Sequence, residues 1–301
     1  MKIIVTGASG FIGSHMLTAL SAKGHEVMGL DLIQSPPPNA TRFILGDLMN
    51  INWQEIYDWQ PECLIHLAGP ASVAASFGDM FSETKNSLLL TSFLLEKLRF
   101  NPDIKLIYMS SAAVYGNHDI LKYSENLTCN PVSPYGVCKL ASEQMIRIAG
   151  ETLGLKYTII RPFSVYGPGL RKQVIYDLAV RFISAEDPII IQSTGKENRD
   201  FVHISDCCSI VCELLHKDYW NGFTFNIGIG RPVSLKKLVS LISEYADVGS
   251  QIIFSGEDRP GNPFNLVADE TALNSFGLSC KISLEEGLRE TMETIKKELL
   301  N

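Results

Sequence analysis

Short apolar runs rich in β-branched residues alternate with longer helical stretches along the first half of the 301-residue chain. This alternation is typical of a parallel sheet covered by helices, and runs that are apolar throughout suit strands buried on both faces. We therefore expect an α/β fold built on a doubly wound parallel sheet. The expected strands are Lys2–Thr6, Glu26–Asp31, Arg42–Gly46, Cys63–Leu67, Lys105–Ser110 and Tyr157–Pro162, and the expected helices are Phe11–Lys23, Met80–Phe100 and Pro134–Gly154.

The alternation becomes irregular after Gly167. From there to Arg199 the helix and strand signals do not extend the first pattern, whereas residues 200–225 again have the pattern of strand, helix and strand. We expect two domains on this basis. Residues 1–167, joined by about 200–225, form the larger one, and residues 168–199 and 226–301 form a smaller C-terminal α/β domain.

A glycine-rich run, Gly7-Ala8-Ser9-Gly10-Phe11-Ile12-Gly13, follows the first expected strand and opens the first expected helix. Gly7 and Gly10 allow a tight turn and a close approach of the backbone to a diphosphate, and Gly13 allows the helix to pack closely on the sheet. The N–H groups at the helix N-terminus are donors for the anion. In this context the run predicts a Rossmann-type dinucleotide site.

Asp31 ends the second expected strand, 18 residues after Gly13. An acidic residue at this place accepts hydrogen bonds from the hydroxyls of the adenosine ribose. Its carboxylate would repel a 2′-phosphate, and no arginine stands beside it to bind one. The sequence therefore predicts NAD rather than NADP as the cofactor.

Composition excludes several other classes of protein. With 46% hydrophobic and 20% charged residues the chain is too apolar for intrinsic disorder, and its net charge of −7 argues against a nucleic-acid or anionic-membrane partner. Its seven cysteines show no zinc-ligand spacing, so we expect free thiols and no metal site. We see no signal-peptide pattern and no apolar run of membrane-spanning length, and expect a cytoplasmic protein.

A second chemical signal lies in Tyr135-Gly136-Val137-Cys138-Lys139. The i, i+4 spacing places Tyr135 and Lys139 on one helix face, where an ammonium can favour ionisation of the phenol. Ser111 follows the fifth expected strand, and its hydroxyl would face the crevice where open α/β sheets bind ligands. These three residues are the candidate catalytic group, with Tyr135 as the general base.

Taken together, these elements resemble the extended short-chain dehydrogenase/reductase family, and within it the nucleotide-sugar epimerases and dehydratases of the UDP-glucose 4-epimerase type. The resemblance runs nearly from end to end. It is carried by GASGFIG at Gly7, Asp31, GDL at Gly46, HLAG at His66, Asn86, SSAAVYG at Ser110, YGVCK at Tyr135, RPFSVYGPG at Arg161, RDFVHISD at Arg199, FNIGIGRPVSL at Phe225 and RPGN at Arg259.

This resemblance implies an NAD-binding first domain, a substrate-binding second domain and a set of ligand contacts. Arg199 and Arg259 match positions that hold the diphosphate and ribose of a nucleotide sugar, and Ser111 and Ser164 match positions beside the sugar. The implied cofactor contacts are Gly7, Gly10, Phe11, Ile12, Gly13, Asp31, Asp47, Leu48, Leu67, Ala68, Gly69, Asn86, Tyr135, Lys139 and Phe163.

Four positions depart from the patterns of the family. The 4,6-dehydratases carry Asp and Glu after the catalytic hydroxyl, where this chain has Ala112 and Ala113, and two methyl groups cannot transfer the protons of a dehydration. Ala112 also stands where reductases of the fucose-synthase type have Cys. Ser164 and Asn262 replace a frequent Asn and a frequent Asp, which bears on the choice of sugar.

We therefore expect an NAD-dependent nucleotide-sugar epimerase that inverts C4 of a UDP-hexose through a transient 4-keto intermediate. A reductase of a nucleotide-linked 4-keto-deoxysugar would use the same residues. A catalytically silent NAD-binding scaffold or sensor is an alternative of another class. The resemblance also implies a homodimer, in which Met80–Phe100 and Pro134–Gly154 pair across a two-fold axis into a four-helix bundle.

Overall fold

The computed structural model describes residues 1–33, 39–216, 219–247, 249–257 and 263–300. Contacts between residues divide the chain into two compact units, which are described separately. Unit 1 comprises residues 1–114, 129–161 and 208–225, and unit 2 comprises residues 115–128, 162–207 and 226–301.

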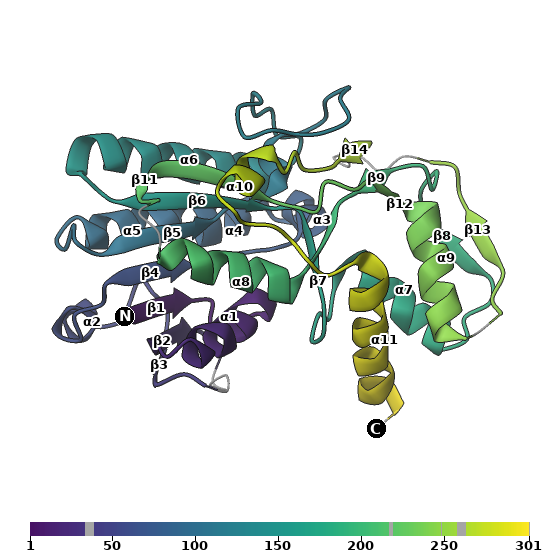
Figure 1. Ribbon diagram of the computed structural model, residues 1–301, viewed down its shortest axis with the longest axis horizontal. Helices are drawn as coiled ribbons and strands as arrows, with labels where there is room; N and C mark the ends of the chain where they lie inside the picture. The colour runs from purple at the N-terminus through teal and green to yellow at the C-terminus, as the bar shows by residue number, and fades with distance from the viewer. Residues whose placement is uncertain (34–38, 217–218, 248, 258–262, 301) are drawn as a thin grey trace. The chain divides into compact units, whose positions relative to one another are not determined.

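A seven-stranded sheet with the strand order β11-β6-β5-β4-β1-β2-β3 is the main feature of the fold (Figure 1). Strand β1 pairs in parallel with β2 on one side and β4 on the other, so the strand order reverses at β1, where sheets of this kind bind ligands. The expected doubly wound α/β class is confirmed. The strands are β1 Lys2–Thr6, β2 Glu26–Asp31, β3 Arg42–Leu45, β4 Cys63–His66, β5 Lys105–Met109, β6 Tyr157–Pro162 and β11 Asn221–Ile227.

Helix α6 (Pro134–Leu153) shows why the helices begin and end where they do. Ser133 accepts a hydrogen bond from the Gly136 N–H at 3.1 Å, Pro134 opens the first turn, and Gly154 ends the helix with a φ of +72°. The cap places Tyr135 in the first turn. The other helices with residues in unit 1 are α1 Phe11–Ala22, α2 Trp53–Asp58, α3 Val73–Gly78, α4 Met80–Thr84, α5 Leu90–Leu98, α8 Ile204–Leu215 and the 3₁₀ turn η2 Ala112–Val114.

The expected helix Met80–Phe100 is wrong as a single element. Helix α4 ends at Thr84, a π-helical segment η1 covers Lys85–Leu89, and α5 follows. A π turn does not follow the 3.6-residue period, so a periodic pattern cannot reveal it, and such turns are frequent at functional sites. The short helices α2 and α3 were also not expected.

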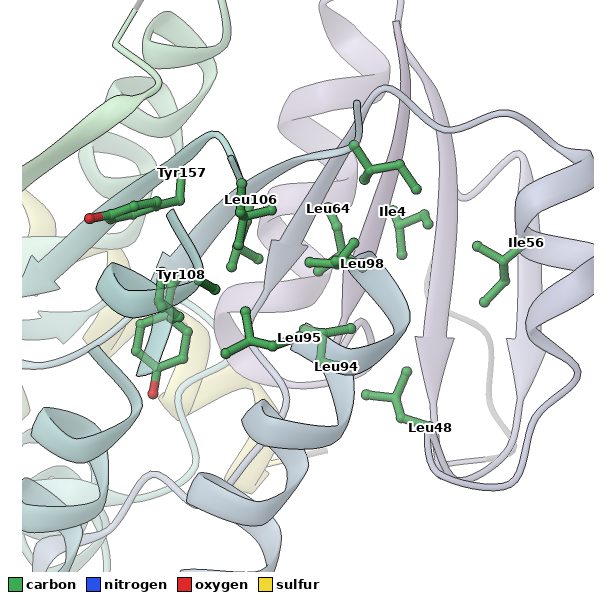
Figure 2. Close-up of a cluster of buried hydrophobic side chains, with 14 of the residues drawn as sticks. Ile4, Leu48, Ile56, Leu64, Leu94, Leu95, Leu98, Leu106, Tyr108 and Tyr157 are labelled. Atoms are coloured by element: carbon green, nitrogen blue, oxygen red, sulfur yellow. The ribbon is translucent and has the colours of Figure 1, made fainter. Parts of the chain in front are cut away.

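The core of unit 1 lies where α5 packs against the sheet. Figure 2 shows Leu94, Leu95 and Leu98 of α5 among the buried side chains of Leu64 and Leu106 from β4 and β5. All five are at most 7% exposed. Burying a leucine side chain stabilises the fold by about 1.5–3 kcal/mol. This layer therefore holds β4 and β5, and with them the residues that follow each strand, in place.

Unit 2 consists of small sheets and a group of helices. Strand β10 pairs with β7, β9 lies between β12 and β14, and β13 pairs with β8. Helices α7, α9 and α11 contact one another. The elements are β7 Ser164–Tyr166, α7 Gln173–Ile183, β8 Ile189–Ile191, β9 Asn198–Arg199, β10 Phe201–His203, β12 Val233–Ser234, α9 Leu235–Ala246, β13 Ile252–Phe254, β14 Asn265–Leu266, α10 Thr271–Ser275 and α11 Leu284–Leu300.

The boundaries of the two units differ from those of the two expected domains. Residues 115–128, 162–167 and 200–207 belong to unit 2 by their contacts, although the sequence pattern grouped them with the sheet. The division into an NAD domain and a substrate domain stays a prediction. Within the described residues, no helix combines the length and the apolar character that crossing a bilayer requires.

Asp200 is the buried polar centre of unit 2. Its Oδ1 accepts a hydrogen bond from the Ile229 N–H at 2.9 Å, and its Oδ2 accepts from the Gly230 and Ala268 N–H groups at 2.8 and 3.1 Å. The residue is 0% exposed. Burial raises its pKa to about 6, while the three N–H donors act in the opposite direction. Asp200 thus joins two segments that lie far apart in the sequence.

We expect Asp200→Asn to lower the free energy of unfolding by about 1–3 kcal/mol, because at least one buried N–H loses its acceptor. Urea unfolding followed by circular dichroism measures this. Asp177→Asn on the exposed side of α7 is the control and should have little effect. Equal stability of the two variants would contradict the assigned role of Asp200.

Candidate functional site

The glycine loop after β1 packs so closely that side chains are excluded from it. Gly7 has a φ of +68°, and a Cβ there would lie 2.8 Å from the Ala68 nitrogen. A Cβ at Gly13 would overlap the carbonyl oxygen of Gly7. Helix α1 therefore begins directly against the loop that connects it to β1, as the spacing of the glycines predicts.

The N-terminus of α1 fits a diphosphate. Gly10 is the N-cap residue and has no side chain to bind the first N–H groups. Phe11, Ile12 and Gly13 form the first turn and carry no acidic group. Uncapped N–H donors and the positive end of the helix dipole favour an anion at this position. The residues present thus fit the dinucleotide predicted from the sequence.

The Asp31 carboxylate is held in place at the end of β2. Its Oδ2 accepts a hydrogen bond from the Ser9 N–H at 2.8 Å, and its Oδ1 accepts from the N–H groups of Leu32 and Ile33 at 2.7 and 3.2 Å. A carboxylate has about four acceptor positions, so about one remains for a ribose hydroxyl. The link to Ser9 places this acidic group beside the glycine loop.

A methyl group at Gly13 tests the close packing of this loop. We expect Gly13→Ala to weaken NAD binding at least about tenfold, or about 1.4 kcal/mol, because α1 must move away from the carbonyl of Gly7. Isothermal titration calorimetry with NAD measures this. Gly78→Ala is the matched control, since a Cβ there meets no atom within 4 Å. Equal affinity of both variants would contradict a cofactor site at the loop.

The end of β4 is held by Thr6 and His66. The Thr6 hydroxyl lies 2.7 Å from His66 Nδ1 and accepts hydrogen bonds from the Leu67 and Ala68 N–H groups, both at 3.2 Å. His66 is 2% exposed, and burial lowers its pKa to about 3, so it is a neutral structural residue. Leu67 and Ala68 are thereby fixed beside the glycine loop.

The other expected cofactor contacts in unit 1 lie on the loops that follow β3 and β4. Asp47 accepts from the Met49 N–H at 2.9 Å and from Asn50 at 3.1 Å, and Leu48 is part of the buried core. A Cβ at Gly69 would lie 3.1 Å from the Asn86 carbonyl oxygen, which places η1 next to this loop. Contacts of these residues with an adenine or a nicotinamide stay predictions.

The three candidate catalytic residues lie just after β5 and on α6. Ser111 follows the end of β5, and its Oγ accepts a hydrogen bond from the Ala113 N–H at 3.1 Å. Lys139 Nζ donates to the Met109 carbonyl oxygen at 2.9 Å and lies 5.8 Å from the centre of the Tyr135 ring. Tyr135 and Lys139 are 9% and 6% exposed. The structure brings the phenol and the ammonium together as the helical spacing predicts.

Burial dominates the pKa values of both groups. It raises the pKa of Tyr135 to about 12, against the effect of a hydrogen bond with Ser111. It lowers the pKa of Lys139 to about 8. The chain by itself therefore keeps the phenol protonated at neutral pH. The effect of Lys139 on the pKa of Tyr135 stays a prediction.

A buried ion pair that the sequence analysis missed supports this pair of residues. Arg161 Nε and one of its terminal nitrogens donate to the two Glu143 oxygens at 2.9 and 2.5 Å, and Ser110 Oγ donates to Glu143 Oε1 at 2.6 Å. Glu143 and Arg161 are 1% and 3% exposed. This cluster ties α6 to β5 and β6 next to Lys139 and Ser111. The one sequence signal was Glu143, four residues after Lys139 on the same helix face.

The remaining predicted site residues belong to unit 2 or lie outside the described residues. Phe163 is buried and its ring centre lies 6.5 Å from that of Tyr115, and the Ser164 N–H donates to the Asp200 carbonyl oxygen at 2.9 Å. Arg199 donates to the Asn198 carbonyl oxygen at 2.7 Å, and burial lowers its pKa to about 10. Arg259 and Asn262 are not among the described residues.

Comparisons with known proteins agree on one family. Residues 3–228 match the NAD dependent epimerase/dehydratase family. An uncharacterized UDP-glucose epimerase of Bacillus subtilis is 32% identical over 306 residues, with 96% of each chain covered. Crystal structures of the UDP-glucose 4-epimerase of Thermotoga maritima with UDP-glucose, and of the UDP-glucuronic acid 4-epimerase of Bacillus cereus with UDP-glucuronic acid and NAD, are similar. Their TM-scores are both 0.91 at 30% and 29% identity, and each comparison covers 99% of this chain and 100% of the other. The chain therefore belongs to the NAD dependent epimerase/dehydratase family.

Proposed function

We propose that this protein is an NAD-dependent UDP-sugar 4-epimerase. The observation that carries the proposal is the arrangement at the start of α6, where Lys139 lies beside the Tyr135 ring and Ser111 acts to lower the pKa of the phenol. The structural similarity to a UDP-glucose 4-epimerase and to a UDP-glucuronic acid 4-epimerase supports the choice of substrate. Asp31 and the glycine loop are the NAD-binding residues of the proposal.

The reaction follows from the chemistry of the sugar. A C4–H bond beside a hydroxyl is not acidic, so inversion of C4 requires transient oxidation to a ketone. Bound NAD supplies the hydride acceptor and donor for this. Tyr135 takes the proton of the 4-hydroxyl and returns it, Ser111 binds the same oxygen, and Lys139 stabilises the phenolate. Rotation of the 4-keto sugar before the hydride returns gives the C4 epimer.

The residues after Ser111 favour this reaction over dehydration. Ala112 is 1% exposed, and the methyl groups of Ala112 and Ala113 offer no acid or base for eliminating water. A 4-ketoreductase would use the same three residues. The two activities differ in stoichiometry, because an epimerase regenerates its cofactor and a reductase consumes it.

Incubation of the purified protein with UDP-glucose or UDP-glucuronic acid tests the proposal. Proton NMR should show the 4-epimer forming without added reduced cofactor, to an equilibrium mixture. Reduced cofactor consumed mole for mole with a 4-keto substrate would instead identify a ketoreductase. NAD binding without turnover of any UDP-, dTDP-, GDP- or CDP-sugar would point to a scaffold or sensor.

For the nucleotide, we propose that Arg199 and Arg259 bind the UDP diphosphate and ribose, with Ser164 and Phe163 beside the sugar and the nicotinamide. A guanidinium binds phosphate oxygens in a bidentate manner. Burial lowers the pKa of Arg199 to about 10, and Glu197 acts in the opposite direction, so the guanidinium stays charged at neutral pH.

For the assembly, we propose a homodimer through α4, η1, α5 and α6. The supporting observation is a set of large apolar side chains exposed on neighbouring elements of unit 1: Phe77, Met80, Phe81, Leu89, Val137, Met145, Ile148 and Leu153. Exposed apolar patches of this kind mark interaction surfaces.

Phe81 is 78% exposed, so Phe81→Glu should leave the fold intact and convert the dimer to a monomer. Sedimentation velocity measures the mass. Leu121→Glu in unit 2, at 84% exposed, is the control and should leave the dimer in place. A monomeric parent protein would contradict this part of the proposal.

A further inference from the structure

Glu83 is a buried acidic residue that neither the sequence analysis nor the proposed reaction uses. It lies on α4 and is 3% exposed. Its Oε1 has no hydrogen-bond partner among the described residues. Carboxylates are rarely buried unless a charge or several hydrogen bonds compensate the lost hydration. Glu83 therefore needs a charge partner.

Helix α4 packs against α6, the helix that carries Lys139. Thr84, next to Glu83, contacts the Cys138 sulfur at 3.8 Å, and Cys138 precedes Lys139. The Lys139 ammonium is the charge that acts on Glu83, opposing the effect of burial. The ammonium of Lys139 is thus influenced by two buried carboxylates, those of Glu83 and Glu143.

Among the other titratable groups around Lys139, none supplies a negative charge with as large an effect on its pKa as Glu83. Glu143 is already bound to Arg161 and Ser110. Tyr108 on β5 has its ring centre 5.1 Å from Lys139 Nζ and is kept neutral by burial, and His66 on β4 is neutral as well. Burial raises the pKa of the Cys138 thiol. Among the charges that raise the pKa of Lys139, Glu83 has the largest effect, ahead of Glu143.

We propose that Glu83 is a positioning residue of the active site: its buried carboxylate keeps Lys139 charged and sets the pH range in which Tyr135 accepts a proton. This inference rests on the proposed epimerase function. Glu83 does not contact the reacting atoms and acts through Lys139 and Tyr135.

The charge of Glu83 shifts the pKa of Lys139 and the pKa of Tyr135 in the same direction. A nearby negative charge favours the ammonium and disfavours the phenolate, so it raises the pKa of Lys139 and that of Tyr135. In a bell-shaped profile of kcat/KM against pH, the two limbs report the titrations of the base and of the ammonium. Removing the charge of Glu83 should move both limbs toward lower pH, whereas a loss of packing would lower the rate without moving them.

Glu83→Gln removes the charge at nearly constant volume. We expect both limbs of the profile to move by at least about 0.5 pH unit toward acid, and Glu83→Asp to restore part of the shift. Glu83→Met serves the same purpose if the glutamine variant fails to fold. Glu96→Gln on α5 is the matched control, because Glu96 is exposed and ion-paired only with Arg99 at 3.4 Å in the described residues. It should leave both limbs unchanged.

A second readout does not depend on catalysis. The Nζ resonance of Lys139, assigned in ¹⁵N NMR with Lys139→Arg, gives the titration midpoint of this ammonium directly. We expect a lower midpoint in Glu83→Gln than in the parent and in Glu96→Gln. An unchanged or higher midpoint in the folded variant would overturn the inference. A lowered midpoint in a protein that turns over no nucleotide sugar would overturn the proposed function and leave the electrostatic coupling intact.

Discussion

Tyr135→Phe should lower kcat for the C4 epimerisation by about 10²–10⁴-fold, the range that a positioned general base contributes. The substitution removes one oxygen from a side chain that is 9% exposed, so the packing of α6 remains. Initial rates with UDP-glucose or UDP-glucuronic acid measure the loss. Titration calorimetry should show that NAD still binds, because the glycine loop and Asp31 are untouched.

Tyr176→Phe on α7 provides the matched control and should retain full activity. A Tyr135→Phe protein that keeps more than about a tenth of the parent kcat would not be compatible with the phenol as the base. If NAD binding were lost together with activity, the effect would belong to cofactor binding and not to proton transfer.

The largest expected effect on stability belongs to the buried pair of Glu143 and Arg161. Glu143→Leu should lower the free energy of unfolding by about 3–5 kcal/mol, because the guanidinium of Arg161 loses the carboxylate that binds it inside the protein. Urea unfolding measures this loss. The double variant Glu143→Leu with Arg161→Met should recover most of it, since apolar replacement of a buried pair is often neutral.

The exposed pair of Glu96 and Arg99 on α5 gives the comparison. Its atoms are 3.4 Å apart and both side chains are about half exposed, so Glu96→Leu should cost less than about 1 kcal/mol. A Glu143→Leu protein as stable as the surface variant would show that the cluster does not hold α6 to β5 and β6. A double variant less stable than the single one would show that Arg161 stabilises the fold through contacts other than that with Glu143.

The parts of the fold that local rules specify could be predicted from the sequence. The apolar runs gave the positions of β1, β2, β4, β5 and β6 to within about a residue, because strands buried on both faces leave a continuous apolar pattern. The proline at the first turn, Pro134, and the break at Gly154 gave α6. The π-helical turn at Lys85–Leu89 could not be predicted, because it depends on packing and not on a periodic pattern.

The candidate site also contains residues that could be predicted from the sequence and residues that could not. Gly7, Gly13, Tyr135 and Lys139 follow from steric and helical spacing, so the sequence contains their geometry. Glu83 and Glu143 could not be recognised as neighbours of Lys139, since the burial of a carboxylate depends on which helices pack together. For that reason the sequence analysis gave the phenol and the ammonium but missed the nearby charges that act on their pKa values.

The fate of the hydrogen at C4 tests the account most directly. A UDP-sugar deuterated at C4 should be converted by this protein to the 4-epimer with the deuterium still at C4, because the hydride leaves and returns within one active site. Proton NMR of the product in ordinary water measures the retention. Exchange of the label for solvent hydrogen during epimerisation would contradict transient oxidation and with it the role of Tyr135 as the base.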